Sequence, residues 1–219
     1  QGTLYGRNAV GGAVNFIAAS PTDEMYAKVK LGVADFDQTS GEVVLSGPLT
    51  DSIGVRFAAT HLDANEGWIK NQMPDNDDLM QGEQTNVRLI VTADLSDAVS
   101  AELMLGRSKQ SGRWTHWAMI EENIPFGVAT FLPAVSVRDN PEGDPILFTE
   151  EPHEVYMRGP TNTDRELDIS SLTLNWDLDN FSITSITSEQ DWENAEQYPA
   201  DSTSTGILMR ASEGTNKTF

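Results

Sequence analysis

The sequence predicts an all-β protein, specifically part of a transmembrane antiparallel up-and-down β-barrel. Apolar and polar residues alternate with a period of two in several stretches, as in strands that have one apolar and one polar face. Short polar turns alternate with long polar connections, which is the arrangement of strands that cross a membrane in barrels. Charged residues gather in the long connections. These three observations together favour a barrel wall.

The composition of the chain argues against several other classes of protein. The 219 residues include 34 acidic and 14 basic side chains, for a net charge of −20, and no cysteine. This acidity argues against nucleic-acid binding, which needs a basic surface. The absence of cysteine excludes disulfides and thiolate metal sites. The sequence contains no apolar run long enough for a transmembrane helix and no signal peptide.

The alternation predicts about seven strands. They lie at roughly 24–34, 42–47, 52–61, 84–94, 98–108, 169–178 and 181–189. Short turns are expected at 47–52, 95–98 and 178–180, and long connections at 61–84, 108–168 and 188–219. Each short turn has a strand on both sides, so the chain repeats a strand-turn-strand unit, as in an up-and-down barrel.

Charge is distributed as a barrel wall requires. The three long connections hold 23 acidic and 8 basic residues, which is −15 of the net −20. We expect the outward strand faces to carry no charge, because a lipid-facing Lys or Arg at the bilayer midplane costs about 2–4 kcal/mol. The charges of the strands fall on the opposite, lumen-facing register, at Lys28, Lys30, Arg56, Arg88 and Glu102. An ordinary antiparallel sheet with one wet face gives the same alternation and stays open as an alternative.

The opening stretch is a glycine-rich turn followed by a short strand-like segment. Gly11 and Gly12 interrupt the chain after the first ten residues, and 13–18 has strand composition before Pro21 ends it. The glycine spacing matches neither phosphate-binding loop pattern. By its chemistry alone, the stretch is a turn and a strand.

This stretch closely resembles the end of the plug domain of TonB-dependent outer-membrane receptors. The plug-motif positions are Leu4, Tyr5, Gly6, Arg7, Ala9, Gly11, Gly12 and Asn15. The segments 47–51 and 63–71 also look like the early barrel of these receptors. The resemblance implies a plug end at 1–21 and the first part of a roughly 22-stranded barrel at 22–219. The chain begins inside the motif and without an initiator methionine, so we expect a fragment.

The resemblance also implies a function. It predicts active uptake of a scarce nutrient through the outer membrane of a Gram-negative cell, with ferric siderophores, cobalamin-like cofactors and glycans as candidate ligands. The implied partners are outer-membrane lipid, the nutrient and TonB, which would act through an N-terminal box upstream of the chain. No enzymatic activity and no cofactor are expected. The alternatives are a passive porin-like channel and a soluble acidic β-sandwich that binds carbohydrate.

Two groups of residues are candidate sites. Arg7 with Glu42 or Glu102 would form an electrostatic latch between plug and wall, because an enclosed arginine needs an acidic partner or water. The aromatic cluster of Trp114, His116 and Trp117 is a candidate ligand contact or an anchor at the membrane interface.

The sequence predicts no metal site and no catalytic residues. His61, His116 and His153 lack zinc-site spacing. The acidic run at 75–78 lacks the glycine and the glutamate of an EF-hand, which leaves a looser calcium loop as a minor alternative to a solvated acidic loop. No serine-histidine-acid spacing indicates a hydrolase.

Overall fold

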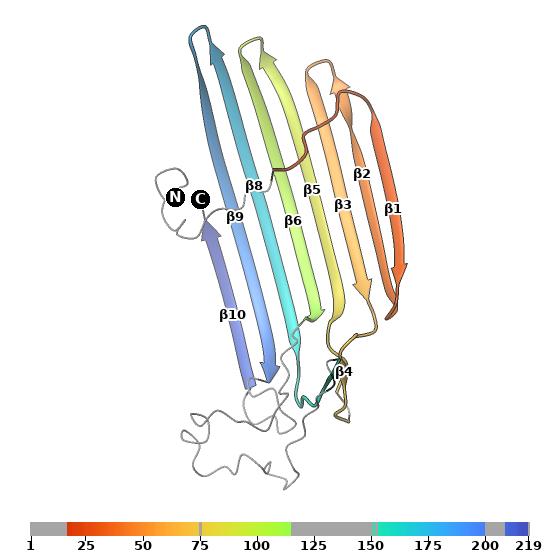
Figure 1. Ribbon diagram of the computed structural model, residues 1–219. Coiled ribbons are helices and arrows are strands. Elements are labelled where there is room, and N and C mark those ends of the chain that lie inside the picture. The colour runs from red at the N-terminus through yellow and green to blue at the C-terminus, as the bar shows by residue number, and fades with distance from the viewer. Residues whose placement is uncertain (1–16, 75, 115–150, 152, 200–208, 219) are drawn as a thin grey trace.

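Strands make up most of the described chain. The computed structural model describes residues 17–74, 76–114, 151, 153–199 and 209–218 (Figure 1). The strands are β1 (Tyr26–Ala34), β2 (Gln38–Thr50), β3 (Ile53–Ala64), β4 (Lys70–Asn71), β5 (Gln81–Ser96), β6 (Val99–Arg113), β7 (Glu154–Val155), β8 (Asn162–Leu178), β9 (Phe181–Pro199) and β10 (Met209–Thr218).

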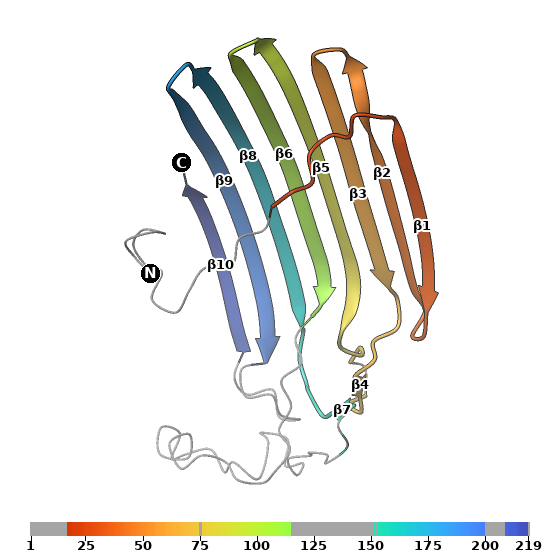
Figure 2. The ribbon, with the colours of Figure 1, turned by 45° about the horizontal axis from the view of Figure 1, so that its top comes forward.

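Eight of these strands form one antiparallel sheet. Its order is β1-β2-β3-β5-β6-β8-β9-β10, so long strands that follow one another in the chain are also neighbours in the sheet. The remaining two short strands, β4 and β7, pair in parallel. The sheet is curved and open, with β1 and β10 at its edges (Figure 2). This confirms the predicted all-β, antiparallel, up-and-down architecture of a partial barrel.

The two ends of the sheet differ. The hairpins β2–β3, β5–β6 and β8–β9 close at one end, shown at the top of Figure 1, which we call the turn end. The connections β3–β5, β6–β8 and β9–β10 leave from the opposite end, which we call the loop end. One connection at the loop end is short, because β1 and β2 are joined by 35–37 alone. Phe36 and Asp37 have φ of 64° and 48° there, the left-handed conformation of a tight turn.

The strands are longer than the sequence predicts. β5, β6, β8 and β9 have 16, 15, 17 and 19 residues, and each extends farther toward the loop end than the predicted ranges. The stretch 188–219, expected to be a long connection, contains the end of β9 and all of β10. The physical reason is that these extensions are mostly polar on both faces, with Leu167 and Trp192 as isolated apolar residues. Apolar alternation is therefore missing, although the main-chain pairing continues without interruption.

The sheet has two distinct faces, which we call inner and outer. The inner face is the one crossed by residues 17–25, which run over the strands near the turn end before β1 begins (Figures 1 and 2). Pro21 lies over Gly54 of β3, where an added Cβ would be 2.9 Å from the Pro21 Cβ. The outer face is the opposite side, and successive residues of each strand alternate between the two.

The sheet is a single layer. Leu103 and Leu174, which a sandwich would bury, are each 39% exposed. In the described part of the chain no second sheet covers either face of the main sheet. The soluble β-sandwich alternative is therefore wrong for these residues. The described residues also include no helix of the length and apolarity needed to cross a membrane.

Candidate functional site

The outer face carries an apolar band next to the turn end. On β6 it consists of Val99, Ala101, Leu103 and Leu105, and the rows continue onto the neighbouring strands because Leu103 pairs with Val91 of β5 and with Leu172 of β8. Between Val99 and Leu105 the strand rises by roughly 20 Å. The apolar band of a transmembrane barrel is about 25 Å tall. The band therefore has the height and composition of a lipid-facing surface.

On β6 and β8 the band ends at a pair of charged residues, Arg107 and Asp168, which we call the Arg107 row. Arg107 of β6 follows Leu105 on the outer face and pairs with Asp168 of β8. Its Nε and Nη2 donate to the two carboxylate oxygens of Asp168 at 2.7 and 2.6 Å. Arg107 Nη2 also lies 3.0 Å from Glu166, and Lys109 Nζ lies 2.7 Å from the same carboxylate. The expectation of an uncharged outer face is therefore wrong from this row onward.

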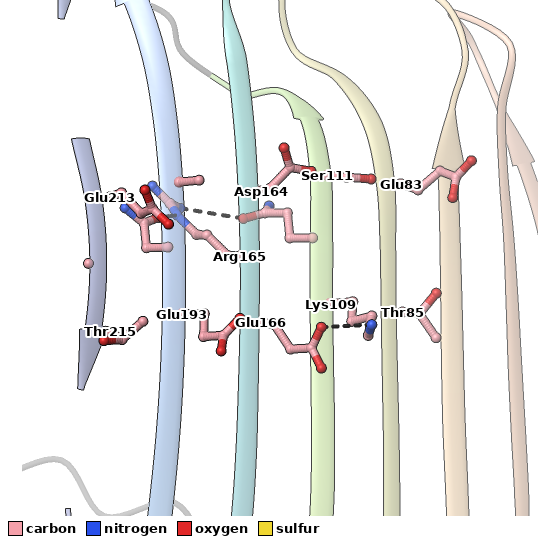
Figure 3. Close-up of a pocket in the computed structure, with 14 residues that line it drawn as sticks. Glu83, Thr85, Lys109, Ser111, Asp164, Arg165, Glu166, Glu193, Glu213 and Thr215 are labelled. Atoms are coloured by element: carbon pink, nitrogen blue, oxygen red, sulfur yellow. Dashed lines mark hydrogen bonds and ion pairs between the residues drawn. The ribbon is translucent and has the colours of Figure 1, made fainter. Parts of the chain in front are cut away.

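Beyond this row, the outer face is a shallow acidic groove (Figure 3). It crosses β5, β6, β8, β9 and β10, and Lys109 and Glu166 face each other in it. Four of its carboxylates have no ion pair within the described part of the chain, namely Glu83, Asp164, Glu193 and Glu213. Unpaired carboxylates are too costly to place against hydrocarbon. This part of the outer face must therefore contact water or polar groups.

The inner face holds the strand charges that the alternation predicts. The pairing register puts five predicted residues on this face, namely Lys28, Lys30, Arg56, Arg88 and Glu102. Lys28 Nζ lies 2.7 Å from Glu42, also on this face. Near the loop end, Arg165 donates to Asn194 at 3.0 Å and forms an ion pair with Glu196. The inner face thus carries charged side chains toward both ends, and it also holds apolar residues, among them Ile90, Met104 and Ile169.

A small seat on the inner face holds the segment that precedes β1. The backbone N–H of Thr22 donates to Ser46 Oγ at 2.9 Å, and the Thr22 hydroxyl lies 3.0 Å from the same oxygen. Ser46 is buried, with 3% of its surface exposed. Gly54 leaves room for Pro21 beside it. The segment 17–25 is therefore held against the sheet by hydrogen bonds to the buried Ser46 hydroxyl and by the packing of Pro21 against Gly54.

The candidate latch is only partly within the described residues. Arg7 lies outside them, together with the rest of the predicted plug motif. Glu42 is already paired with Lys28, whereas Glu102 makes no ion pair with another described residue. The proposed pairing of Arg7 with Glu102 stays a prediction.

Of the predicted aromatic cluster, the structure describes Trp114. Its indole Nε1 donates to the Ser111 carbonyl at 2.9 Å, just beyond the end of β6. His116 and Trp117 lie outside the described residues. Trp114 is therefore at the loop end, well past the Arg107 row.

Two aspartates of the acidic run at 75–78 form ion pairs with basic side chains. Asp77 pairs with Arg113, and Asp78 pairs with Lys70 at 2.8 Å. No group of three or more histidine or acidic side chains in the described ranges is arranged to hold a metal ion. His61 contacts Thr85 at 2.8 Å, and His153 packs edge-on against Trp68.

Part of the chain is similar to known receptors. The ferripyoverdine receptor of Pseudomonas aeruginosa is 40% identical over 58 residues, covering 26% of this chain and 7% of that receptor. The pesticin receptors of Yersinia enterocolitica and Yersinia pestis are 30% identical over 79 residues, covering 36% of this chain and 12% of theirs. The matched part thus spans about a tenth of these relatives' lengths. No family model and no solved structure matches the chain. The similarity supports a receptor role in general and leaves the ligand open.

Proposed function

We propose that the chain is part of a TonB-dependent outer-membrane receptor that takes up a scarce nutrient. In this proposal the sheet is a section of the barrel wall, with the apolar band of the outer face against lipid and the inner face toward the lumen. Residues 1–21 form the end of a plug, of which the described part, 17–21, lies along the inner face (Figure 1). TonB acts through a box upstream of Gln1.

The observation that carries the proposal is the change of the outer face at the Arg107 row. On β6 and β8 the outer face is apolar up to Leu105 and Leu172, and ion-paired at Arg107 and Asp168. Exposed apolar side chains in a single-layer sheet need a cover, and a bilayer supplies one of the observed height. A surface that faces water throughout has no reason to change from apolar to charged at one level of two neighbouring strands.

The long strands fit the same arrangement. β6 has 15 residues and extends over roughly 50 Å, about twice the height of the apolar band. The extra length lies beyond Arg107, so the wall continues past the membrane at the loop end. Trp114 would then lie seven residues beyond the boundary, or roughly 23 Å along the strand. This position favours the ligand-contact interpretation over the interface anchor for Trp114.

The ligand class that we propose first is a ferric siderophore. This proposal is supported by the similarity to the ferripyoverdine receptor, which is 40% identical to this chain over 58 residues and whose name indicates a ferric siderophore ligand. The inner face and the loop end offer hydrogen-bonding groups for such a ligand, including Arg165 with its partners Asn194 and Glu196. Cobalamin-like cofactors and glycans are the other ligand classes to be tested.

A test of the proposal uses the complete gene in a Gram-negative host. The protein should be recovered in the outer-membrane fraction and should need detergent for extraction. Growth on a ferric siderophore as the iron source should require both this gene and the TonB complex. Recovery as a soluble protein would contradict the membrane proposal, and uptake that survives loss of TonB would indicate a passive channel.

A further inference from the structure

Two connections that are distant in sequence are folded together at the loop end. We call the unit formed by residues 65–74, 76–80 and 153–161 the cap. The short strands β4 and β7 join the two parts through parallel pairing of Lys70 with Glu154 and of Asn71 with Val155. Beside them, the N–H of Gln72 donates to the Val155 carbonyl at 2.8 Å. Figure 2 shows this pair of short strands below the ends of the main sheet.

The cap has an apolar core of its own. Ile69, Leu79, Val155 and Met157 form one cluster, and each is at most 6% exposed. Five of the eight buried hydrophobic residues in the described chain belong to the cap, since Met73 is buried as well. Both connections contribute to the cluster, so neither can bury its apolar side chains without the other.

Asn71 links the two connections through its side-chain amide. Its Nδ2 donates to the Met157 carbonyl at 2.8 Å, and its Oδ1 accepts from the Met157 N–H at 3.1 Å. The same Oδ1 accepts from the Met73 N–H at 3.3 Å. A second amide repeats the link, because Asn76 Oδ1 accepts from the Gly159 N–H at 3.1 Å. The side-chain amides of Asn71 and Asn76 thus extend the main-chain pairing of β4 and β7, which is only two residues long.

The cap touches the rest of the sheet at two places. At the β1–β2 turn, the N–H groups of Asn65 and Glu66 donate to the carbonyls of Asp37 and Phe36 at 3.3 and 3.2 Å. The second place is the end of β6. Met80 N–H donates to the Arg113 carbonyl at 2.6 Å, and Asp77 pairs with the Arg113 side chain. Next to them, Gly82 and Gly112 face each other across β5 and β6 with φ of 142° and 129°. Only glycine readily adopts such φ values, and facing glycines mark a bend or a close approach of two backbones.

We infer that the cap is a single cooperative lid, which orders and opens as one unit. It does not consist of two loops that move independently. The inference goes beyond the proposed function, and the cap's place at the ligand-facing end of a receptor rests on that proposal. A ligand that touches one of the two connections then orders the other as well.

Amide hydrogen exchange of the full-length protein in detergent tests this inference without any transport assay. Asn71→Ala removes the amide link, and its neighbour Gln72→Ala is the matched control, because the Gln72 side chain is exposed and makes no hydrogen bond within the described residues. Asn71→Ala should accelerate exchange by about tenfold or more in both 66–80 and 153–161. Exchange in the paired parts of β5, β6 and β8 should be unchanged.

The reciprocal variant, Met157→Ala, should accelerate exchange in the same two segments, although the substitution lies in the other connection. Gln72→Ala should leave both segments at the wild-type rate. Acceleration confined to the mutated connection would overturn the inference, as would unchanged exchange in both variants. Because the measurement needs neither a ligand nor TonB, its failure is distinct from failure of the proposed function.

Discussion

Arg107 and Asp168 form a two-point ion pair across β6 and β8, with Arg107 Nε and Nη2 at 2.7 and 2.6 Å from the two carboxylate oxygens. The pair lies on the outer face directly after the last leucine of β6. Its side chains are about half exposed, at 54% and 42%, and an exposed pair of this kind contributes little to stability. In the proposed arrangement, the pair marks the level at which β6 and β8 leave the membrane.

The same substitution should be costly on the outer face of β8 and tolerated on its inner face. Leu174→Arg introduces a charge into the apolar band, at an expected cost of about 2–4 kcal/mol near the bilayer midplane. Its chain neighbour Thr173 is on the inner face, opposite Glu102, so Thr173→Arg should be tolerated. The amount of folded protein in the outer membrane, measured by heat-modifiable gel mobility, checks this. Equal tolerance of both variants would contradict the assignment of the faces.

The bend beneath the cap should depend on glycine. In Gly82→Ala the new Cβ would lie 2.1 Å from the Ser111 carbonyl oxygen and 2.7 Å from the Gly112 Cα. We expect destabilisation on the order of 1–3 kcal/mol, because both the space and the φ of 142° exclude a side chain. Gly106→Ala is the control on β6, where the nearest atom is 3.8 Å away. Urea unfolding in detergent compares the two variants, and a stable Gly82→Ala protein would show that the bend is not constrained.

The attachment of the segment 17–25 to the sheet should depend on the hydroxyl of Ser46. Ser46→Ala removes the acceptor of the Thr22 N–H, and a partly buried donor without a partner costs about 1–3 kcal/mol. Protease cleavage within 17–25 should therefore become faster, whereas the exposed Ser40→Ala on the same face of β2 should leave it unchanged. Identical cleavage rates in the two variants would mean that the segment is held by other contacts.

The plug–wall latch predicts a specific coupling. Glu42 is occupied by Lys28, so we expect Arg7 to pair with Glu102. In full-length protein, Arg7→Gln and Glu102→Gln should each lower the unfolding midpoint, and the double variant should be no worse than the single ones. Additive effects would show that the two residues do not interact, and a measured separation above about 8 Å would exclude the pair directly.

The apolar half of the sheet could be predicted from the sequence, and the polar half could not. Alternation at 84–94 and 98–108 located β5 and β6 because leucine and valine alternate there with polar residues. The same strands continue through Glu83 and Lys109 with polar side chains on both faces, which gives no periodic contrast. β10 was missed for this reason, since its residues are almost all small or polar.

The contacts that organise the two ends of the sheet also had no local sequence signal. Thr22 and Ser46 are 24 positions apart, and Asn71 and Met157 are 86 apart. Such pairs become visible once the strand register places them together. The charged position at Arg107 could have been predicted from the sequence, because Arg107 falls on the outward register of the predicted strand 98–108. A marker of the membrane boundary could have been recognised there.

The most direct test of a membrane boundary at Arg107 is a cysteine scan along β6 in the full-length protein in outer membranes. The chain has no cysteine of its own, so each introduced thiol is a unique reporter for a membrane-impermeant maleimide. Cysteines at Leu103 and Leu105 should be protected by lipid, and cysteines at Lys109 and Ser111 on the same face should react. Cysteines at Met104 and Ser108 report on the inner face and should react once the lumen is accessible. Equal reactivity at positions 103 and 109 would contradict a membrane boundary at Arg107.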